Sequence, residues 1–145
     1  MSDSNQADID RLCLEQMADA LIYADNQGVI IRWNAAATVL FGHSSAQALG
    51  QSLDLIIPES LRATHWSAFD RAMETGVTRL NGRATVTRAL TADGGAVYVE
   101  MSFAVVTDGN GKAIGSVAIA RDATKRRQEE KELRERLAAL ERGAA

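Results

Sequence analysis

The chain has 145 residues, 46% of them hydrophobic, and a formal net charge of −3 at pH 7, which suits one domain whose core needs neither a disulfide nor a structural metal. Because the chain has a single cysteine, Cys13, it can form neither an internal disulfide nor a cluster of cysteine ligands. Outside the charged C-terminal segment the sequence has no basic stripe, so nucleic-acid binding is not expected. With no signal peptide and no apolar run long enough for a membrane span, we expect a cytoplasmic protein.

The beginning of the chain predicts a helix and then a hairpin. Residues 1–8 are polar and are expected to be frayed, whereas apolar residues at steps of three and four from Ile9 onward predict a short amphipathic helix. Two short apolar segments follow, over residues 20–24 and 29–33. The Asp-Asn-Gln-Gly sequence of residues 25–28 between them favours a tight turn, so two antiparallel strands are expected.

Three helices are expected next, because residues that begin or end helices recur at the right spacing. Asn34 suits the N-cap of a helix that ends at Gly42. A second, short helix is expected over residues 44–49, where serines stand at the start. Pro58, the only proline, suits the first turn of a longer helix that ends at Gly76.

Beyond the third helix the apolar spacing changes to every second residue, which predicts strands. We expect long strands over residues 78–90, 97–106 and 113–120. The segments 92–95 and 108–111 are rich in Asp and Gly and are expected to be the turns that join these strands into an antiparallel meander.

The C-terminal segment is charged and helical, with a narrow apolar stripe. Its candidate coiled-coil positions are Glu130, Leu133, Leu137 and Leu140, fewer than two heptads. Since so short a seam is too weak alone, we expect a homodimer formed by the N-terminal and C-terminal helices together; a solvated helix without a partner is the alternative. In signalling proteins such a helix leads to an output domain or partner, which the sequence does not identify.

The order of these elements resembles the PAS domain, a small sensory module. Three motifs carry the resemblance: the strand, turn, strand and helix that end in Phe-Gly over residues 25–42, the Asp93-Gly94 turn, and Arg-Asp-Ala-Thr over residues 121–124. The resemblance covers about residues 12–124. It implies an α+β fold in which a five-stranded antiparallel sheet carries short helices over its concave face and encloses a pocket.

The same resemblance divides the chain into three parts. An N-terminal tail and helix are expected over residues 1–19, the PAS domain over residues 20–124, and a charged helix over residues 125–145.

The helix after Pro58 resembles the heme-binding helix of PAS sensors of the FixL type. The positions in register are Pro58, Arg62, His65, Phe69, Arg71 and Thr75-Gly76. In that family the helix histidine is the proximal iron ligand, so the resemblance implies heme b at His65. Independently, His65 falls on one apolar stripe of the helix with Leu61, Phe69, Ala72 and Met73, which predicts that its imidazole faces the pocket. The alternative is a core histidine without a metal.

The distal side of the expected heme departs from the FixL type. The arginine of that family corresponds to Thr85, and Arg83 lies two residues earlier on the same face. Met101 falls where the family has an aliphatic distal residue; its thioether is a candidate sixth iron ligand or a core filler. Because the FixL-type arginine is absent, we expect sensing of CO, NO or a redox state and not strong discrimination in favour of oxygen. The expected cofactor-binding residues are Leu61, His65, Phe69, Leu80, Arg83, Thr85, Met101 and Phe103.

The same residues bear on other functions. The segment 46–56 contains no cysteine, and Cys13 lies ahead of the domain, so a flavin photoadduct is not expected. Non-covalent FAD, a small metabolite, or a cofactor-free module for dimerisation and signal relay are the alternatives to heme. An enzyme is not expected, because no nucleophile, base and acid are grouped and no glycine loop suits a phosphate.

Overall fold

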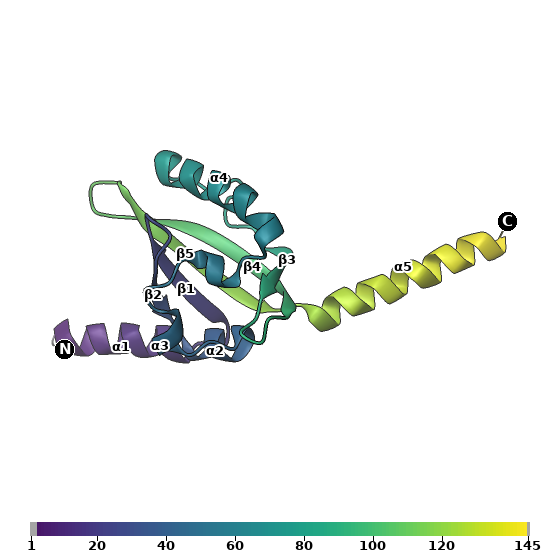
Figure 1. The fold of residues 1–145 in the computed structure, drawn as a ribbon, viewed down its shortest axis with the longest axis horizontal. Coiled ribbons are helices and arrows are strands. Elements are labelled where there is room, and N and C mark those ends of the chain that lie inside the picture. Colours follow the sequence, from purple (N-terminus) through teal and green to yellow (C-terminus); the bar gives the residue numbers. More distant parts are fainter. Residues whose placement is uncertain (1–2, 145) are drawn as a thin grey trace.

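The computed structural model describes residues 3–144 and shows a five-stranded sheet flanked by helices (Figure 1). In chain order the elements are α1 (Asp3–Gln16), β1 (Ala20–Asp25), β2 (Ile30–Trp33), α2 (Ala35–Phe41), α3 (Ser45–Ala48), the 3-10 helix η1 (Leu53–Ile56), α4 (Glu59–Thr75), β3 (Thr85–Leu90), β4 (Ala96–Thr107), β5 (Ala113–Asp122) and α5 (Thr124–Ala144). The strand order is β2-β1-β5-β4-β3, with every pair antiparallel. The expected α+β architecture is confirmed.

The buried side chain of Asn34 links α1, β1 and α2, because it forms hydrogen bonds with four backbone groups. Its Oδ1 accepts hydrogen bonds from the backbone N–H of Ala37 at 3.0 Å and of Leu21 at 2.9 Å. Its Nδ2 donates to the carbonyl oxygens of Leu14 at 2.9 Å and Asp19 at 3.0 Å. The predicted N-cap of α2 therefore also fixes the end of α1 and the beginning of β1.

Two boundaries differ from the sequence-based expectation. The helix α1 begins at Asp3, not near Ile9, and a hydrogen bond of 3.1 Å from Gln6 to Asp10 supports its first turns. The prediction of a long strand over residues 78–90 is wrong in its first part, because the strand comprises only Thr85–Leu90. Asn81 and Gly82 before it have φ values of 51° and 83°, which no strand accommodates.

The inner face of the sheet, which faces α4, carries large side chains at some positions and small ones at others. Ile22 and Val99 are fully buried on it. The inner faces of β1 and β5, in contrast, carry a row of small buried residues: Ala20, Ala24, Ser116, Ala118 and Ala120. Because these side chains fill little volume, space remains between β5 and α4.

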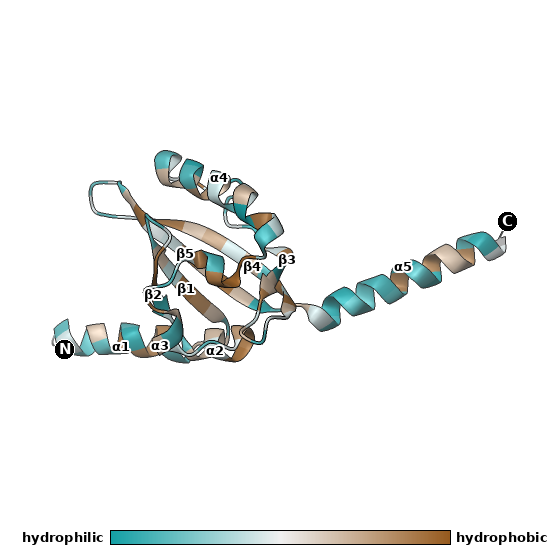
Figure 2. Cartoon of the chain, viewed as in Figure 1, coloured by the Kyte–Doolittle hydropathy of each residue, from teal (hydrophilic) through white to brown (hydrophobic). Residues whose placement is uncertain are grey.

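The outer face of β4 holds the beginning of α5. Arg126 forms an ion pair of 3.1 Å with Glu100, and the guanidinium of Arg127 lies 4.1 Å from the ring centroid of Tyr98. The N–H of Ala123 also donates to the carbonyl oxygen of Tyr98 at 2.8 Å. Beyond this root α5 projects away from the sheet and is hydrophilic over most of its length (Figures 1 and 2).

Within residues 3–144, no helix combines the length and the apolar character that a crossing of the lipid bilayer requires.

Candidate functional site

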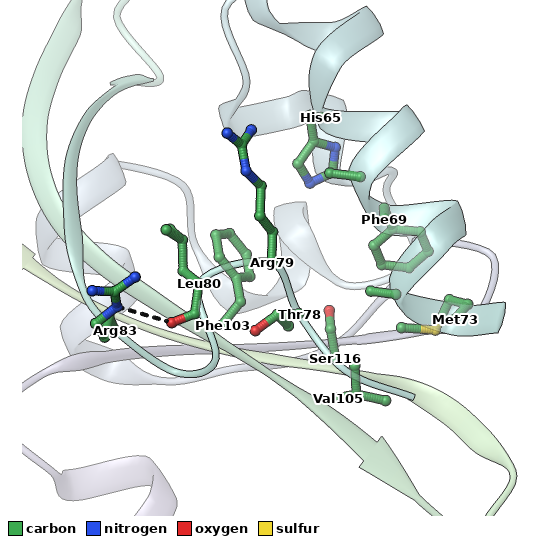
Figure 3. Close-up of a pocket in the computed structure, with 12 residues that line it drawn as sticks. His65, Phe69, Met73, Thr78, Arg79, Leu80, Arg83, Phe103, Val105 and Ser116 are labelled. Atoms are coloured by element: carbon green, nitrogen blue, oxygen red, sulfur yellow. Dashed lines mark hydrogen bonds between the residues drawn. The ribbon is translucent and has the colours of Figure 1, made fainter. Parts of the chain in front are cut away.

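A cavity of about 220 Å³ lies between α4, the loop of residues 76–84 and the inner face of β4 and β5 (Figure 3). Its walls are His65, Ala68, Phe69, Ala72, Met73, Thr78, Arg79, Leu80, Arg83, Phe103, Val105 and Ser116. Most of these side chains are apolar, and the polar ones come from three different walls. The cavity can therefore hold an apolar ligand and address it with a few polar groups.

His65 reaches the cavity from α4. The helix begins after Pro58 and ends at Gly76, whose φ of 79° provides the left-handed cap. The His65 ring centroid lies 6.0 Å from that of Phe69 and 6.4 Å from that of Phe103 on β4, so the imidazole faces the sheet. The predicted orientation of His65 is confirmed.

Partial burial favours the neutral form of His65. Desolvation lowers the pKa of His65 below its ordinary value of 6.5, although the carboxylates of Asp54 and Asp70 partly offset this effect. The Nδ1 atom is buried without a hydrogen-bond partner in the described part of the chain. A neutral imidazole is a strong ligand for iron.

Neighbouring residues fix the position of α4 and thereby of His65. The indole N–H of Trp66 donates to Asp54 at 2.7 Å, and Arg62 donates to the carbonyl oxygen of Ile57 at 3.0 Å. The Trp66 ring lies directly against Gly28 in the β1–β2 turn, where any Cβ would overlap it. The N-terminal half of α4 is thus held against both η1 and the hairpin.

The floor of the cavity belongs to the sheet. Phe103 and Val105, two residues apart on β4, both lie on its inner face. Ser116 of β5 is the pairing partner of Val105. Ser116 is only 6% exposed. Figure 3 shows its hydroxyl directed from the sheet into the cavity.

Two arginines stand on the loop that forms the third wall. Arg79 and Arg83 are both exposed, and Arg83 donates to the carbonyl oxygen of Leu80 at 3.4 Å. Figure 3 shows Arg79 extending from the loop toward the α4 side of the cavity. Their positive charges at the mouth suit a ligand that carries carboxylates.

The structure brings together five of the eight predicted site residues: His65, Phe69, Leu80, Arg83 and Phe103 line the cavity. Leu61 lies in the first turn of α4 and is 38% exposed. Met101, only 5% exposed, is part of the core and pairs with Ala120 and with Thr85. Leu61, Thr85 and Met101 do not line the cavity.

Sequence reasoning missed Arg79 and Ser116. Arg79 falls inside a segment that alternation predicts to be a strand, so its position at the mouth could not be inferred. Ser116 could have been found, because it shares a two-residue spacing with Ala118 and Ala120 and is the polar member of that row.

The residues present fit heme in type. One neutral imidazole faces apolar walls, and two arginines stand at the mouth, where propionates would lie. No group of three His, Cys, Asp or Glu side chains within residues 3–144 is arranged to hold a metal ion, but heme iron needs few protein ligands. The volume of about 220 Å³ is below the roughly 300–1,000 Å³ of typical ligand sites, so heme would require the cavity to widen.

Comparisons with known proteins agree on the fold. A family model described as "PAS fold" matches residues 14–128. The crystal structure of a PAS domain from Colwellia psychrerythraea superimposes with a TM-score of 0.72 at 26% identity, over 83% of this chain and 98% of that one.

Two curated relatives are named as sensors. The sensor protein FixL of Bradyrhizobium diazoefficiens is 28% identical over 125 residues, which are 86% of this chain and 24% of the relative. The oxygen sensor protein DosP of Escherichia coli is 26% identical over 129 residues, 88% of this chain and 16% of the relative. This chain therefore spans less than a quarter of the length of either.

Proposed function

The chain belongs to the PAS fold family and is a sensory domain, and from this premise we propose that its cavity holds heme b through His65 to sense a diatomic gas or a redox state. One observation carries the proposal: a half-buried imidazole, whose pKa is lowered by desolvation, faces an apolar cavity, and its Nδ1 atom has no hydrogen-bond partner within residues 3–144. A buried nitrogen without a hydrogen-bond partner in the described residues is expected where a group from outside the chain completes the site.

Each wall has a role in holding the heme. His65 would provide the axial nitrogen, Phe69 and Phe103 would pack on the macrocycle, and Arg79 and Arg83 would pair with its propionates. When bound, heme supplies an iron whose redox state and open coordination position are the sensing chemistry.

The loop of residues 76–84 is the wall that can move to admit the heme. Its backbone hydrogen bonds are local, from Asn81 to Thr78 at 3.2 Å and from Arg83 to Leu80 at 3.0 Å. Outward movement of this loop therefore breaks none of the hydrogen bonds that pair the strands. A site widened along β4 would next reach Met101, which remains the candidate sixth ligand.

The heme sensor would act as a cytoplasmic homodimer without catalytic activity of its own. The apolar stripes of α1 and α5 would contact a second copy, and α5 would carry the signal to an output domain or partner protein.

The test is titration of purified protein with hemin, followed by the Soret band. The wild type should bind one equivalent, and His65→Ala should lose most of the binding because the axial nitrogen is gone. His43→Ala is the matched control, because His43 lies on a loop away from the cavity and binds Trp33 Nε1 through its carbonyl oxygen at 3.1 Å. A wild type that does not take up hemin stoichiometrically would overturn the proposal.

A second candidate is a ligand smaller than heme, and the volume of about 220 Å³ favours it. The apolar walls and the arginines at the mouth would suit a compact apolar acid, whereas non-covalent FAD would require more widening. A cofactor-free relay module is the remaining alternative. Wild-type protein that ignores hemin but is stabilised against heat by an aromatic carboxylic acid such as benzoate would favour the small ligand.

A further inference from the structure

The chain contains two Asn-Gly pairs, and both lie in exposed turns. Asn81-Gly82 stands in the loop of residues 76–84 that forms one wall of the cavity, and Asn110-Gly111 stands in the turn between β4 and β5. Asparagine followed by glycine is especially prone to spontaneous deamidation, because glycine has no side chain to hinder attack by its backbone nitrogen. The two pairs share this chemistry, so their surroundings decide which of them reacts faster.

Deamidation begins at the backbone nitrogen of the glycine. After this nitrogen loses its proton to water, it attacks Cγ of the asparagine, and the bond from Cγ to the side-chain nitrogen breaks with release of ammonia. The product is a five-membered succinimide, which water opens at either carbonyl to leave aspartate or isoaspartate. A glycine N–H that donates a hydrogen bond reacts more slowly, because this bond must break before the nitrogen can attack.

Hydrogen bonding distinguishes the two pairs. The N–H of Gly111 donates to the carbonyl oxygen of Asp108 at 3.0 Å, and the N–H of Asn110 donates to Asp108 Oδ1 at 2.9 Å. In the other pair, the N–H of Gly82 and the side-chain amide of Asn81 form no hydrogen bond with any group of residues 3–144. The nitrogen that must attack is therefore held in the β4–β5 turn and free in the loop at the cavity.

The backbone around Asn81 can also change conformation to bring the two reacting atoms together. Asn81 has a φ of 51° and is the only residue other than glycine with a positive φ within residues 3–144, a conformation that is sparsely populated. Its turn is closed by two local hydrogen bonds, from Asn81 to Thr78 at 3.2 Å and from Arg83 to Leu80 at 3.0 Å. Because neither bond involves the sheet or α4, the turn can rearrange without disturbing them.

We propose that Asn81 is a site of spontaneous deamidation and that its counterpart Asn110 is protected. The reaction replaces a neutral amide by a carboxylate, which is negatively charged at neutral pH. This carboxylate would stand on the same loop as Arg79 and Arg83, both of which line the cavity (Figure 3). The charge at the mouth of the cavity would thus depend on the age of the molecule, whether or not the cavity holds heme.

The test is incubation of the purified wild type at mildly alkaline pH, followed by mass spectrometry of its peptides. Cleavage after glutamate places the two asparagines on different peptides, residues 75–100 and 101–129, each of which contains no other asparagine. The initial rate of deamidation should be about fivefold higher at Asn81 than at Asn110, the effect of the one hydrogen bond that holds Gly111. Equal rates, or a faster reaction at Asn110, would overturn the proposal.

The same measurement in concentrated urea is the matched control. Once the chain is unfolded, the hydrogen bond to Gly111 is lost, and the rates at Asn81 and Asn110 should converge because glycine follows both. Convergence would attribute the difference in the native protein to the fold. A difference of the native size that persists in urea would assign it to the neighbouring sequence and overturn the structural argument.

Discussion

At His65 the environment opposes protonation. Because burial lowers the pKa of the folded state below the ordinary value of 6.5, the unfolded chain binds a proton first as the pH falls. At a pH above the pKa of His65 in the unfolded chain, its titration does not change the free energy of unfolding. As the pH falls from that pKa toward the lower pKa in the folded state, the free energy of unfolding decreases. Asp54 and Asp70 reduce the effect without reversing its sign.

We therefore expect wild-type apoprotein to lose more thermal stability between about pH 7.5 and about pH 5.5 than the variant His65→Phe. Phenylalanine keeps an apolar ring at this position but does not titrate, and all carboxylates are common to both proteins. The measurement is the melting temperature at the two pH values. Parallel losses in the two proteins would show that His65 does not titrate differently on unfolding.

Individual residues were predictable from sequence where a local rule governs them. Asn34 caps α2 and His65 faces the sheet, as helix capping and helical periodicity required. Leu61 shares the stripe of His65 but lies in the first turn of α4, beyond the reach of the sheet, and is exposed. Helical periodicity predicts the direction in which a side chain points, but it does not predict how far along the helix the sheet extends.

Among the elements, α4 is positioned by contact with a turn far away in sequence. The Trp66 indole packs where Gly28 has no side chain, and Gly28 has a φ of 77°. Gly50 has a similar φ of 85°, but a Cβ at that position would meet no atom within 4 Å. A comparison of alanine variants at Gly28 and Gly50 therefore distinguishes the effect of backbone strain from the effect of losing the contact with α4.

The variant Gly28→Ala should lower the free energy of unfolding by roughly 1–3 kcal/mol more than Gly50→Ala, because only the former forces Trp66 away. Both variants place an L-residue at a positive φ, which costs roughly 1–2 kcal/mol. Urea unfolding at equilibrium measures the difference. Equal losses in the two variants would mean that Trp66 moves aside at no cost and does not fix α4.

The larger of the two errors in the sequence-based prediction concerns the segment before β3. Alternating residues continue upstream of β3 as if the strand began at Thr78, yet Asn81 and Gly82 adopt left-handed conformations and the strand begins at Thr85. The turn chemistry overrides the alternation there. The consequence is the loop that carries Arg79 and Arg83, so an error of element type concealed part of the site.

The attachment of α5 to β4 gives a route by which a change in the cavity would reach this helix. Along β4, Phe103 and Val105 line the cavity, whereas Tyr98 and Glu100 on the other face hold Arg127 and Arg126. A shift of β4 caused by a ligand would therefore reach the root of α5 through the same strand.

For the whole molecule, two terminal helices carry apolar side chains that the domain does not cover. On α1 these are Ile9, Leu12 and Leu14, and on α5 they are Leu133, Leu137 and Leu140, all exposed. Between α1 and the edge of the sheet at β2 lies a groove of about 640 Å³. A symmetric dimer would cover these surfaces, which is the state we expect in solution.

Deletion of residues 1–15 should shift the protein from dimer toward monomer, because the short α5 stripe is too weak to hold two copies alone. Sedimentation velocity over a range of concentrations measures the shift. The variant Leu137→Ala, which weakens only the α5 stripe, is the control and should weaken the dimer less. An unchanged dimer after the deletion would exclude α1 from the interface.

The two tryptophans have different surroundings, and only one of them adjoins the cavity. Trp66 lies edge-on to His65, with ring centroids 4.8 Å apart. Trp33 is buried elsewhere in the core, where its N–H donates to Thr38 and to the carbonyl oxygen of His43, each at 3.1 Å. Tryptophan fluorescence of the variant Trp33→Phe would therefore come from Trp66 alone. The protein thus carries an optical probe next to His65, and its emission would report occupancy of the cavity without any added label.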